Sequence, residues 1–154
     1  MRKPKQVLVF LYRKNEDENY EYCIFYRDKL KFWQGISGGV EDDESLIETV
    51  KREVFEETGI CVNDMYQLSS ISSIPVVDIT KESSCDNDVY VVPEYSFGVP
   101  LENHDIHLSS EHKEYKWCLF DETYEKLKFD SNKTALWELN QRLLNNDIKR
   151  PEIF

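Results

Sequence analysis

The chain has 154 residues, which favours one domain over residues 1–154 with a core of its own. Its 30 acidic and 19 basic residues give a net charge of −11, which argues against a nucleic-acid surface, because such a surface needs clustered Lys and Arg. No apolar run approaches the roughly 20 residues that cross a bilayer, so we expect no membrane partner.

The acidic charge also restricts how the protein can bind phosphates, because divalent cations must then act as intermediaries. The four cysteines match no C-x-x-C pattern for zinc or redox chemistry; they are Cys23, Cys61, Cys85 and Cys118. With no export signal visible, we expect reduced thiols, mostly in or near the core of a cytoplasmic protein.

The first predicted elements are two strands. Residues 6–13 are apolar and 20–27 are rich in aromatics, and the polar turn between them favours an antiparallel hairpin. The basic start followed by an apolar run resembles a signal peptide, but Tyr12 and Arg13 interrupt that run and no small-residue cleavage site follows. A first strand is therefore the better interpretation.

Residues 43–58 are predicted to form a helix, with Asp42 or Asp43 as its N-cap and Gly59 at its end. At 100° per residue, one apolar stripe contains Leu46, Ile47, Val50 and Val54. A neighbouring arc of about 100° contains Glu53, Glu56 and Glu57. One face of the helix therefore suits a core, while its edge presents three carboxylates in one patch.

The remainder alternates strands and helices, which predicts a mixed α/β sandwich rather than a regular βαβ repeat. We expect Pro93 to confine its strand to a sheet edge or a bulge, and Trp117 and Trp137 to lie in the core. The predicted elements are strands at 60–74, 89–101 and 114–120, a short helix at 121–127 and an amphipathic helix at 131–146 capped by Asp130 or Ser131.

Glycines and acids recur at fixed spacing through residues 38–60. A glycine is followed after five residues by a glutamate, and after seven more by Arg-Glu-apolar-x-Glu-Glu-x-Gly-apolar. The constrained positions are Gly38, Glu44, Arg52, Glu53, Val54, Glu56, Glu57, Gly59 and Ile60. This segment resembles the Nudix box, the signature of a family of phosphoanhydride hydrolases.

The chemistry of pyrophosphate hydrolysis agrees with this resemblance, because it needs neutralised phosphate charge and an activated water. Glu53 and Glu57 are like charges at i,i+4, which destabilise a helix, and a bound Mg²⁺ would relieve their repulsion. Gly38 and Gly39 are expected to let the backbone turn sharply into the helix and approach a phosphate closely. Arg52 is flanked by Glu48 and Glu56, and we expect it to orient Glu56.

The resemblance implies a Nudix-type α/β/α sandwich, with a mixed central sheet, the box helix packed on it and a C-terminal helix. It implies a Mg²⁺-dependent hydrolase, with Mn²⁺ as a substitute, acting on a small-molecule phosphoanhydride. Carried over onto this chain, the metal ligands in the box are Glu53 and Glu57. A further acid often comes from a loop outside the box, and the narrower resemblance described next favours Glu111 as this third ligand. The catalytic residues are Arg52, Glu53 and Glu56, and which glutamate serves as the base stays open.

A narrower resemblance links the chain to bacterial dihydroneopterin triphosphate pyrophosphatases. It rests on short patches at 32–34, Ser37, 111–112 and 115–117, whereas segment 74–89, where a specificity loop could lie, matches no pattern of that group. The substrate contacts that it implies are Arg27, Trp33, Ser37, Gly38, Gly39 and His112.

Several of these contacts have an equally simple structural interpretation. Arg27 suits a phosphate contact or a solvated strand end, and Ser37 suits a substrate contact or a turn. Trp33 suits stacking on a flat heterocycle or a core anchor, and His112 suits a hydrogen bond or simple packing. His104 and His107, in a polar loop, are expected to be ordinary surface residues.

Two other functions remain open at this point. One is hydrolysis of a different nucleotide polyphosphate, either a dinucleoside polyphosphate or a nucleoside triphosphate, since Trp-Gln before the box also occurs in such relatives. The other is a Nudix-fold binding module without catalysis, which an intact box disfavours. Both a monomer and a homodimer are compatible with the aromatic-rich strands.

Overall fold

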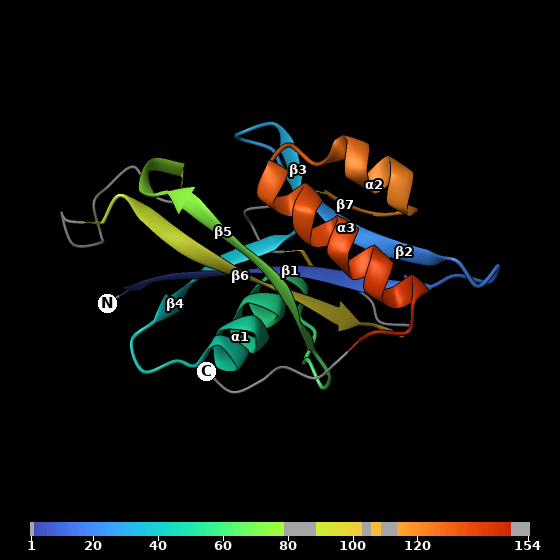
Figure 1. The fold of residues 1–154 in the computed structure, drawn as a ribbon, viewed down its shortest axis with the longest axis horizontal. Coiled ribbons are helices and arrows are strands. Elements are labelled where there is room, and N and C mark those ends of the chain that lie inside the picture. Colours follow the sequence, from blue (N-terminus) through green and yellow to red (C-terminus); the bar gives the residue numbers. More distant parts are fainter. Residues whose placement is uncertain (1, 79–88, 103–105, 109–113, 149–154) are drawn as a thin grey trace.

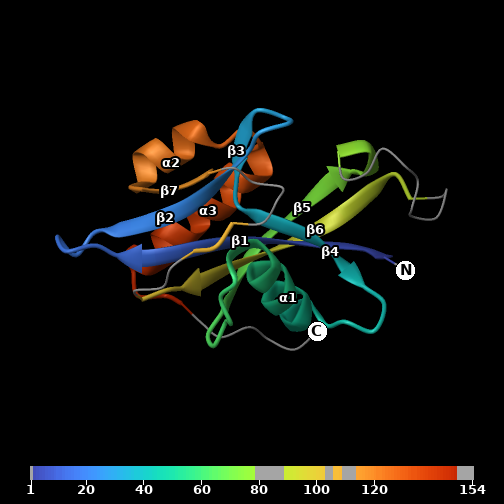
Figure 2. The ribbon, with the colours of Figure 1, turned by 180° about the vertical axis from the view of Figure 1, so that it is seen from behind.

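The computed structural model describes residues 2–78, 89–102, 106–108 and 114–148. A mixed sheet lies between helix α1 on one face and helices α2 and α3 on the other (Figures 1 and 2), as the sequence predicts. The elements are β1 (Arg2–Lys14), β2 (Tyr20–Arg27), β3 (Phe32–Gln34), β4 (Ile36–Glu41), α1 (Leu46–Thr58), β5 (Tyr66–Pro75), a 3₁₀ turn (Val76–Asp78), β6 (Val91–Pro100), β7 (Glu114–Cys118), α2 (Phe120–Lys126) and α3 (Asp130–Leu144).

Strand β1 organises the sheet, whose main path is β3-β2-β1-β6-β5, with β4 added beside β1 and β7 beside β2. The second half of β1 pairs antiparallel with β2, with Leu11 opposite Cys23, which confirms the predicted hairpin. Its first half pairs antiparallel with β4, with Val7 opposite Gly38, and the residues from Gln6 to Tyr12 pair parallel with β6. Strand β4 therefore lies beside the part of β1 with which β2 does not pair.

Alternation along β1 sends successive side chains into two different cores. Val7, Val9 and Leu11 lie in a cluster with Val50 and Val54 of α1. The alternate residues of β1 lie in a second cluster with side chains of α3; its main members are Leu8, Phe10, Leu136 and Leu139. The predicted apolar stripe of α1 is confirmed, since Leu46 and Ile47 pack against the first cluster.

The helix starts differ from the predictions. Helix α1 is capped by Ser45, which forms a capping box with Glu48, whereas Asp43 sits in a turn with φ 69°. Asp42 and Asp43, the predicted caps, therefore lie in the turn between β4 and α1 and do not cap the helix. Helix α3 has Phe129 at its N-cap with no side-chain cap bond, so Asp130, predicted as a cap, lies in its first turn.

Two other predictions change once the strands are placed. Strand β6 lies inside the sheet, between β1 and β5, and not at an edge. Pro93 is nevertheless tolerated, because the pairing of β6 with β1 begins one residue later, at Glu94. Trp137 on α3 is 54 % exposed and so lies outside the core, whereas Trp117 is half-buried beneath the Arg13 guanidinium, 4.0 Å from its ring centre.

The cysteines are partly as predicted. Cys23 and Cys118 are buried free thiols and Cys61 is an exposed one, while Cys85 lies outside the described residues. Within the described part of the chain, no helix is both long enough and apolar enough to span a membrane.

One carboxylate fastens α3 to strand β5. The register of β5 against β6 shifts between Gln67 and Ile71, which releases backbone donors. The Glu138 carboxylate accepts hydrogen bonds from the Ser69 and Ser70 amides, at 2.6 and 2.8 Å, and from Arg142 Nε at 2.7 Å. Although burial opposes it, the hydrogen bonds from Ser70, Ser69 and Arg142 lower the pKa of Glu138.

We predict that Glu138→Gln lowers the free energy of unfolding by about 1.5–3 kcal/mol at about pH 7, the range for hydrogen bonds to charged groups. A depressed carboxylate pKa stabilises the fold above the unfolded value of 4.5 and ceases to do so as pH falls through the folded value. Urea unfolding at several pH values should therefore show the difference from wild type shrinking in acid. A difference that stays constant with pH, or that also appears in the exposed control Glu125→Gln, would contradict this role.

Candidate active site

The site begins where strand β4 passes beneath helix α1. A Cβ placed on Gly38 would lie 2.0 Å from Cδ of Glu53, so only glycine leaves space for that carboxyl group. Gly38 and Gly39 are strand residues, and among the five glycines only Gly59 has a positive φ. The predicted sharp turn at Gly38 and Gly39 is therefore wrong, and close packing of a side chain explains the glycine.

Arg52 connects the parts of the site through all its guanidinium nitrogens. Its Nε lies 2.6 Å from Glu44 Oε2, its Nη1 2.8 Å from Glu53 Oε1, and its Nη2 2.8 Å from the Gly39 carbonyl oxygen. Glu56 is a more distant partner, at 3.4 Å. Arg52 therefore holds Glu53 against β4 more closely than it holds Glu56, the partner that the sequence suggested.

The charges in this cluster are strongly perturbed. The hydrogen bond from Arg52 lowers the pKa of Glu44 to about 2. Burial raises the pKa of Glu53 to about 7, against the opposing effect of Arg52. Glu44 is a box position to which the sequence analysis gave no role, and the structure makes it the main anion for Arg52.

Two box glutamates are buried side by side on successive turns of α1. Glu53 is 9 % exposed and Glu57 is 6 % exposed, while the Glu56 side chain is 54 % exposed. Hard oxygen donors at i,i+4 fit a divalent cation such as Mg²⁺. Within the described residues no trio of His, Cys, Asp or Glu forms a ready ligand group; the third predicted ligand, Glu111, lies outside those residues, as does His112.

The remaining predicted contacts lie on different faces of the sheet. Arg27 ends β2 on the face of Cys23 and Phe25, which pack in the α1 cluster. Trp33 lies on the opposite face, with its ring 5.2 Å from that of Tyr26 and Lys126 above it. Ser37 is half-buried opposite Leu8, and His107 is exposed, as expected. The structure thus places Gly38 and Gly39 near the box carboxylates. Trp33 lies on the opposite face of the sheet from those carboxylates.

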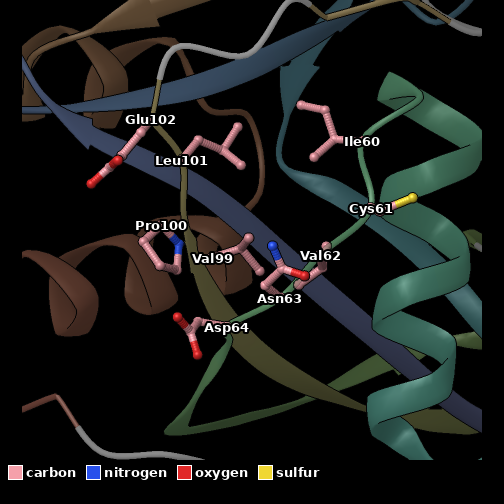
Figure 3. A pocket seen from close by; sticks show the side chains of 9 residues that line it. All are labelled: Ile60, Cys61, Val62, Asn63, Asp64, Val99, Pro100, Leu101 and Glu102. Carbon is pink, nitrogen blue, oxygen red and sulfur yellow. The ribbon is translucent and has the colours of Figure 1, made fainter.

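A separate pocket of about 290 Å³ opens beyond the C-terminal end of α1, between the segment 60–64 and the end of β6 (Figure 3). Its polar lining includes Asn63, Asp64 and Glu102. None of the box carboxylates lines it, so this pocket is distinct from the carboxylate site.

The sheet between helices, with buried acids on the box helix against a strand glycine, defines a Nudix-type hydrolase. The NUDIX domain model matches residues 2–137, and the chain belongs to this family, whose hydrolases generally use divalent metal ions. A Listeria monocytogenes structure described as a NUDIX hydrolase is 41 % identical, with a TM-score of 0.86, and the match covers 97 % of this chain and 100 % of that one.

Relatives with named activities are more distant. A dihydroneopterin triphosphate diphosphatase of Haemophilus influenzae is 24 % identical over 136 residues, which cover 86 % of this chain and 84 % of the relative. A rat asymmetrical bis(5'-nucleosyl)-tetraphosphatase is 29 % identical over 117 residues, or 75 % of each chain. The Escherichia coli dihydroneopterin triphosphate pyrophosphohydrolase has the same fold, with a TM-score of 0.74, 24 % identity, and coverage of 94 % of this chain and 97 % of that one.

We predict that Gly38→Ala lowers kcat by about 100-fold, because a methyl group there displaces the Glu53 carboxyl and a shift of about 1 Å is enough for such a loss. The measurement is steady-state hydrolysis of the best substrate, with circular dichroism to verify folding. If the loss acts through Glu53, then adding Gly38→Ala to Glu53→Gln should change little more. Fully additive losses would mean that Gly38 acts by another route.

We also predict that Arg52→Lys is not conservative, because one ammonium group cannot reach Glu44, Glu53 and the Gly39 carbonyl together. Activity should fall by about 10–100-fold, the range for residues that position a metal ligand, because we expect Glu53 to be such a ligand. Titration calorimetry with Mg²⁺ should show a matching loss of affinity. The exposed neighbour on the same helix, Lys51→Ala, is the control, and equal effects in both variants would contradict the network.

Proposed function

We propose that this hydrolase is a Mg²⁺-dependent pyrophosphohydrolase of dihydroneopterin triphosphate that releases pyrophosphate. The observation that carries the chemistry is the buried pair Glu53 and Glu57 on α1, of which Glu53 packs against Gly38 of β4. The substrate is supported by the Phe-Trp-Gln and Ser37 pattern before the box and by the Haemophilus relative of that activity.

In this proposal Glu53 and Glu57, together with Glu111, hold the cation. When bound there, the cation would supply charge neutralisation at the phosphate oxygens and would favour deprotonation of water. Arg52 keeps Glu53 in place through its 2.8 Å contact, and Glu44 fixes Arg52 in turn. A box glutamate takes the proton of the attacking water, with Glu56 as a further ligand or as a partner of that base. The water oxygen bonds to phosphorus, one P–O–P bond breaks, and pyrophosphate leaves.

Contacts to the substrate are assigned to both sides of β4. Gly38 and Gly39 bring the backbone close to the phosphates, and Arg27 and His112 donate hydrogen bonds to the substrate. Ser37 and Trp33 lie on the other face of the sheet, where the heterocycle would bind.

Hydrolysis of a dinucleoside tetraphosphate is the second candidate, because the rat relative with that activity is 29 % identical to this chain. The two candidates differ in product, since only the first releases pyrophosphate from a monomeric triphosphate. A common carboxylate site would serve both.

The test is hydrolysis of dihydroneopterin triphosphate, diadenosine tetraphosphate, ADP-ribose and the nucleoside triphosphates with Mg²⁺, with pyrophosphate and phosphate measured separately. We expect the pterin to have the highest kcat/KM, with pyrophosphate as its product. Preference for the dinucleotide would move the assignment to the second candidate.

We predict that Glu57→Gln lowers kcat at least about 100-fold, because metal-based charge stabilisation contributes several kcal/mol to the transition state. The exposed carboxylate control, Glu125→Gln, should retain the rate. Undiminished, equally Mg²⁺-dependent hydrolysis by Glu57→Gln would exclude the proposed metal site.

A further inference from the structure

A second buried carboxylate lies across the sheet from the box glutamates. Glu94 on β6 is 3 % exposed, and its Oε2 accepts a 2.5 Å hydrogen bond from Gln6 Nε2. Its other oxygen, Oε1, is buried and has no hydrogen-bond partner in the structure as far as it is described. Such an unsatisfied acceptor is unfavourable in a fold and calls for an explanation.

Strand register places Glu94 on the face that carries α3. It lies opposite Gln6 of β1, one alternation before Leu8, whose cluster contains the α3 leucines. Burial raises the pKa of Glu94 to about 7, and Gln6 and the nearby Ser131 hydroxyl oppose this shift. Ser131 is thus close to the carboxyl, although its hydroxyl does not satisfy Oε1.

The surroundings of Glu94 are polar, although the carboxyl group itself is buried. Ser72 of β5 lies directly opposite Glu94, and Gly39 of β4 lies opposite Gln6. Ser72, Gly39 and Ser131 are all half-buried rather than sealed. Figures 1 and 2 show that the start of β6 and the end of β5 extend beyond the first turn of α3, and the 3₁₀ helix Val76–Asp78 follows β5 at this end of the sheet.

Strand β4 joins this patch to the active site. Gly38 touches Glu53 on the α1 face, whereas its neighbours Ser37 and Gly39 alternate to the face of Gln6 and Glu94. Among the described strands β4 pairs only with β1. A ligand with its phosphates beside α1 and its other end beside Glu94 would have to pass around β4 and then lie across β1, because β1 separates β4 from β6.

The acceptor chemistry restricts what that other end can be. In its charged form the Glu94 carboxylate accepts hydrogen bonds and donates none, and it can take two parallel donors at once. A ring N–H beside an exocyclic amino group, as in a 2-amino-4-oxopyrimidine ring, offers that pair. Adenine presents a ring nitrogen acceptor beside its amino group, which the carboxylate would repel.

We propose that Glu94 is a specificity-determining residue that binds the amino and N–H edge of a 2-amino-4-oxopyrimidine ring, the edge that pterins and guanine share. The inference rests on the proposed function, since it assigns the heterocycle end of the same substrate. Oε1 takes the hydrogen bond that the protein itself leaves unmade, while Gln6 keeps Oε2 in place.

The test compares GTP with ITP, which lacks only the 2-amino group. Binding is measured by titration calorimetry with Ca²⁺ in place of Mg²⁺, and hydrolysis is measured with Mg²⁺, with dihydroneopterin triphosphate and ATP included. Wild type should prefer GTP over ITP by about 10-fold or more in both measurements, as expected for loss of one hydrogen bond to a charged group. Glu94→Gln should reduce that ratio to about 1–3, mainly through Kd and KM.

Two variants keep the test decisive. Glu94→Asp retains a carboxylate and should retain a preference for GTP, at weaker affinity, even if Glu94→Gln folds poorly. Glu21→Gln removes a carboxylate at the other end of β1, where it pairs with Arg13, and should keep the wild-type ratio.

The outcomes separate the two proposals. A GTP-to-ITP ratio near 1 in wild type, or one that Glu94→Gln leaves intact, would overturn the role of Glu94 even if hydrolysis proceeds. Selective binding without hydrolysis would support Glu94 and count against the proposed catalytic function alone.

Discussion

The burial of Glu53 against Gly38 is the constraint on which the rest of the site depends. A carboxylate in that position needs a strand residue without a side chain below it and a cation beside it. Arg52 supplies that cation, and Glu44 and the Gly39 carbonyl fix its guanidinium group. The contacts of Arg52 connect α1 to β4. The packing of the helix on the strand therefore also fixes the position of the Glu53 carboxylate.

The position of β4 also gives the two faces of the sheet different chemistry. Strand β4 replaces β2 beside β1, and its alternation gives two faces with different chemistry. Gly38 belongs to the carboxylate face, and Ser37 and Gly39 belong to the face of Glu94. One short strand thus separates the carboxylate site from the heterocycle site that we propose. Two buried acids with raised pKa values, Glu53 and Glu94, lie on opposite sides of it.

Much of the fold followed from patterns along the chain. The apolar stripe of α1 and the hairpin of β1 and β2 were predictable, because period and turn chemistry are local properties. The ends of the helices were not. Ser45 rather than Asp42 or Asp43 caps α1, since several polar residues precede the helix and only the path of the turn selects among them. Trp137 is exposed because α3 presents a different side to the sheet from the one its composition suggested.

For the site, the sequence by itself determined the family, and it predicted the roles of the box glutamates and Arg52 from their spacing along one helix. Contacts between distant segments were decided only by the tertiary structure. Arg52 pairs with Glu44 and not with Glu48. Gly38 is needed for close packing rather than for a turn. Glu94 forms a hydrogen bond with Gln6, which is 88 positions away in the sequence. No local pattern marks Glu94, since a lone glutamate in a strand resembles a solvated one until strand order and register bury it.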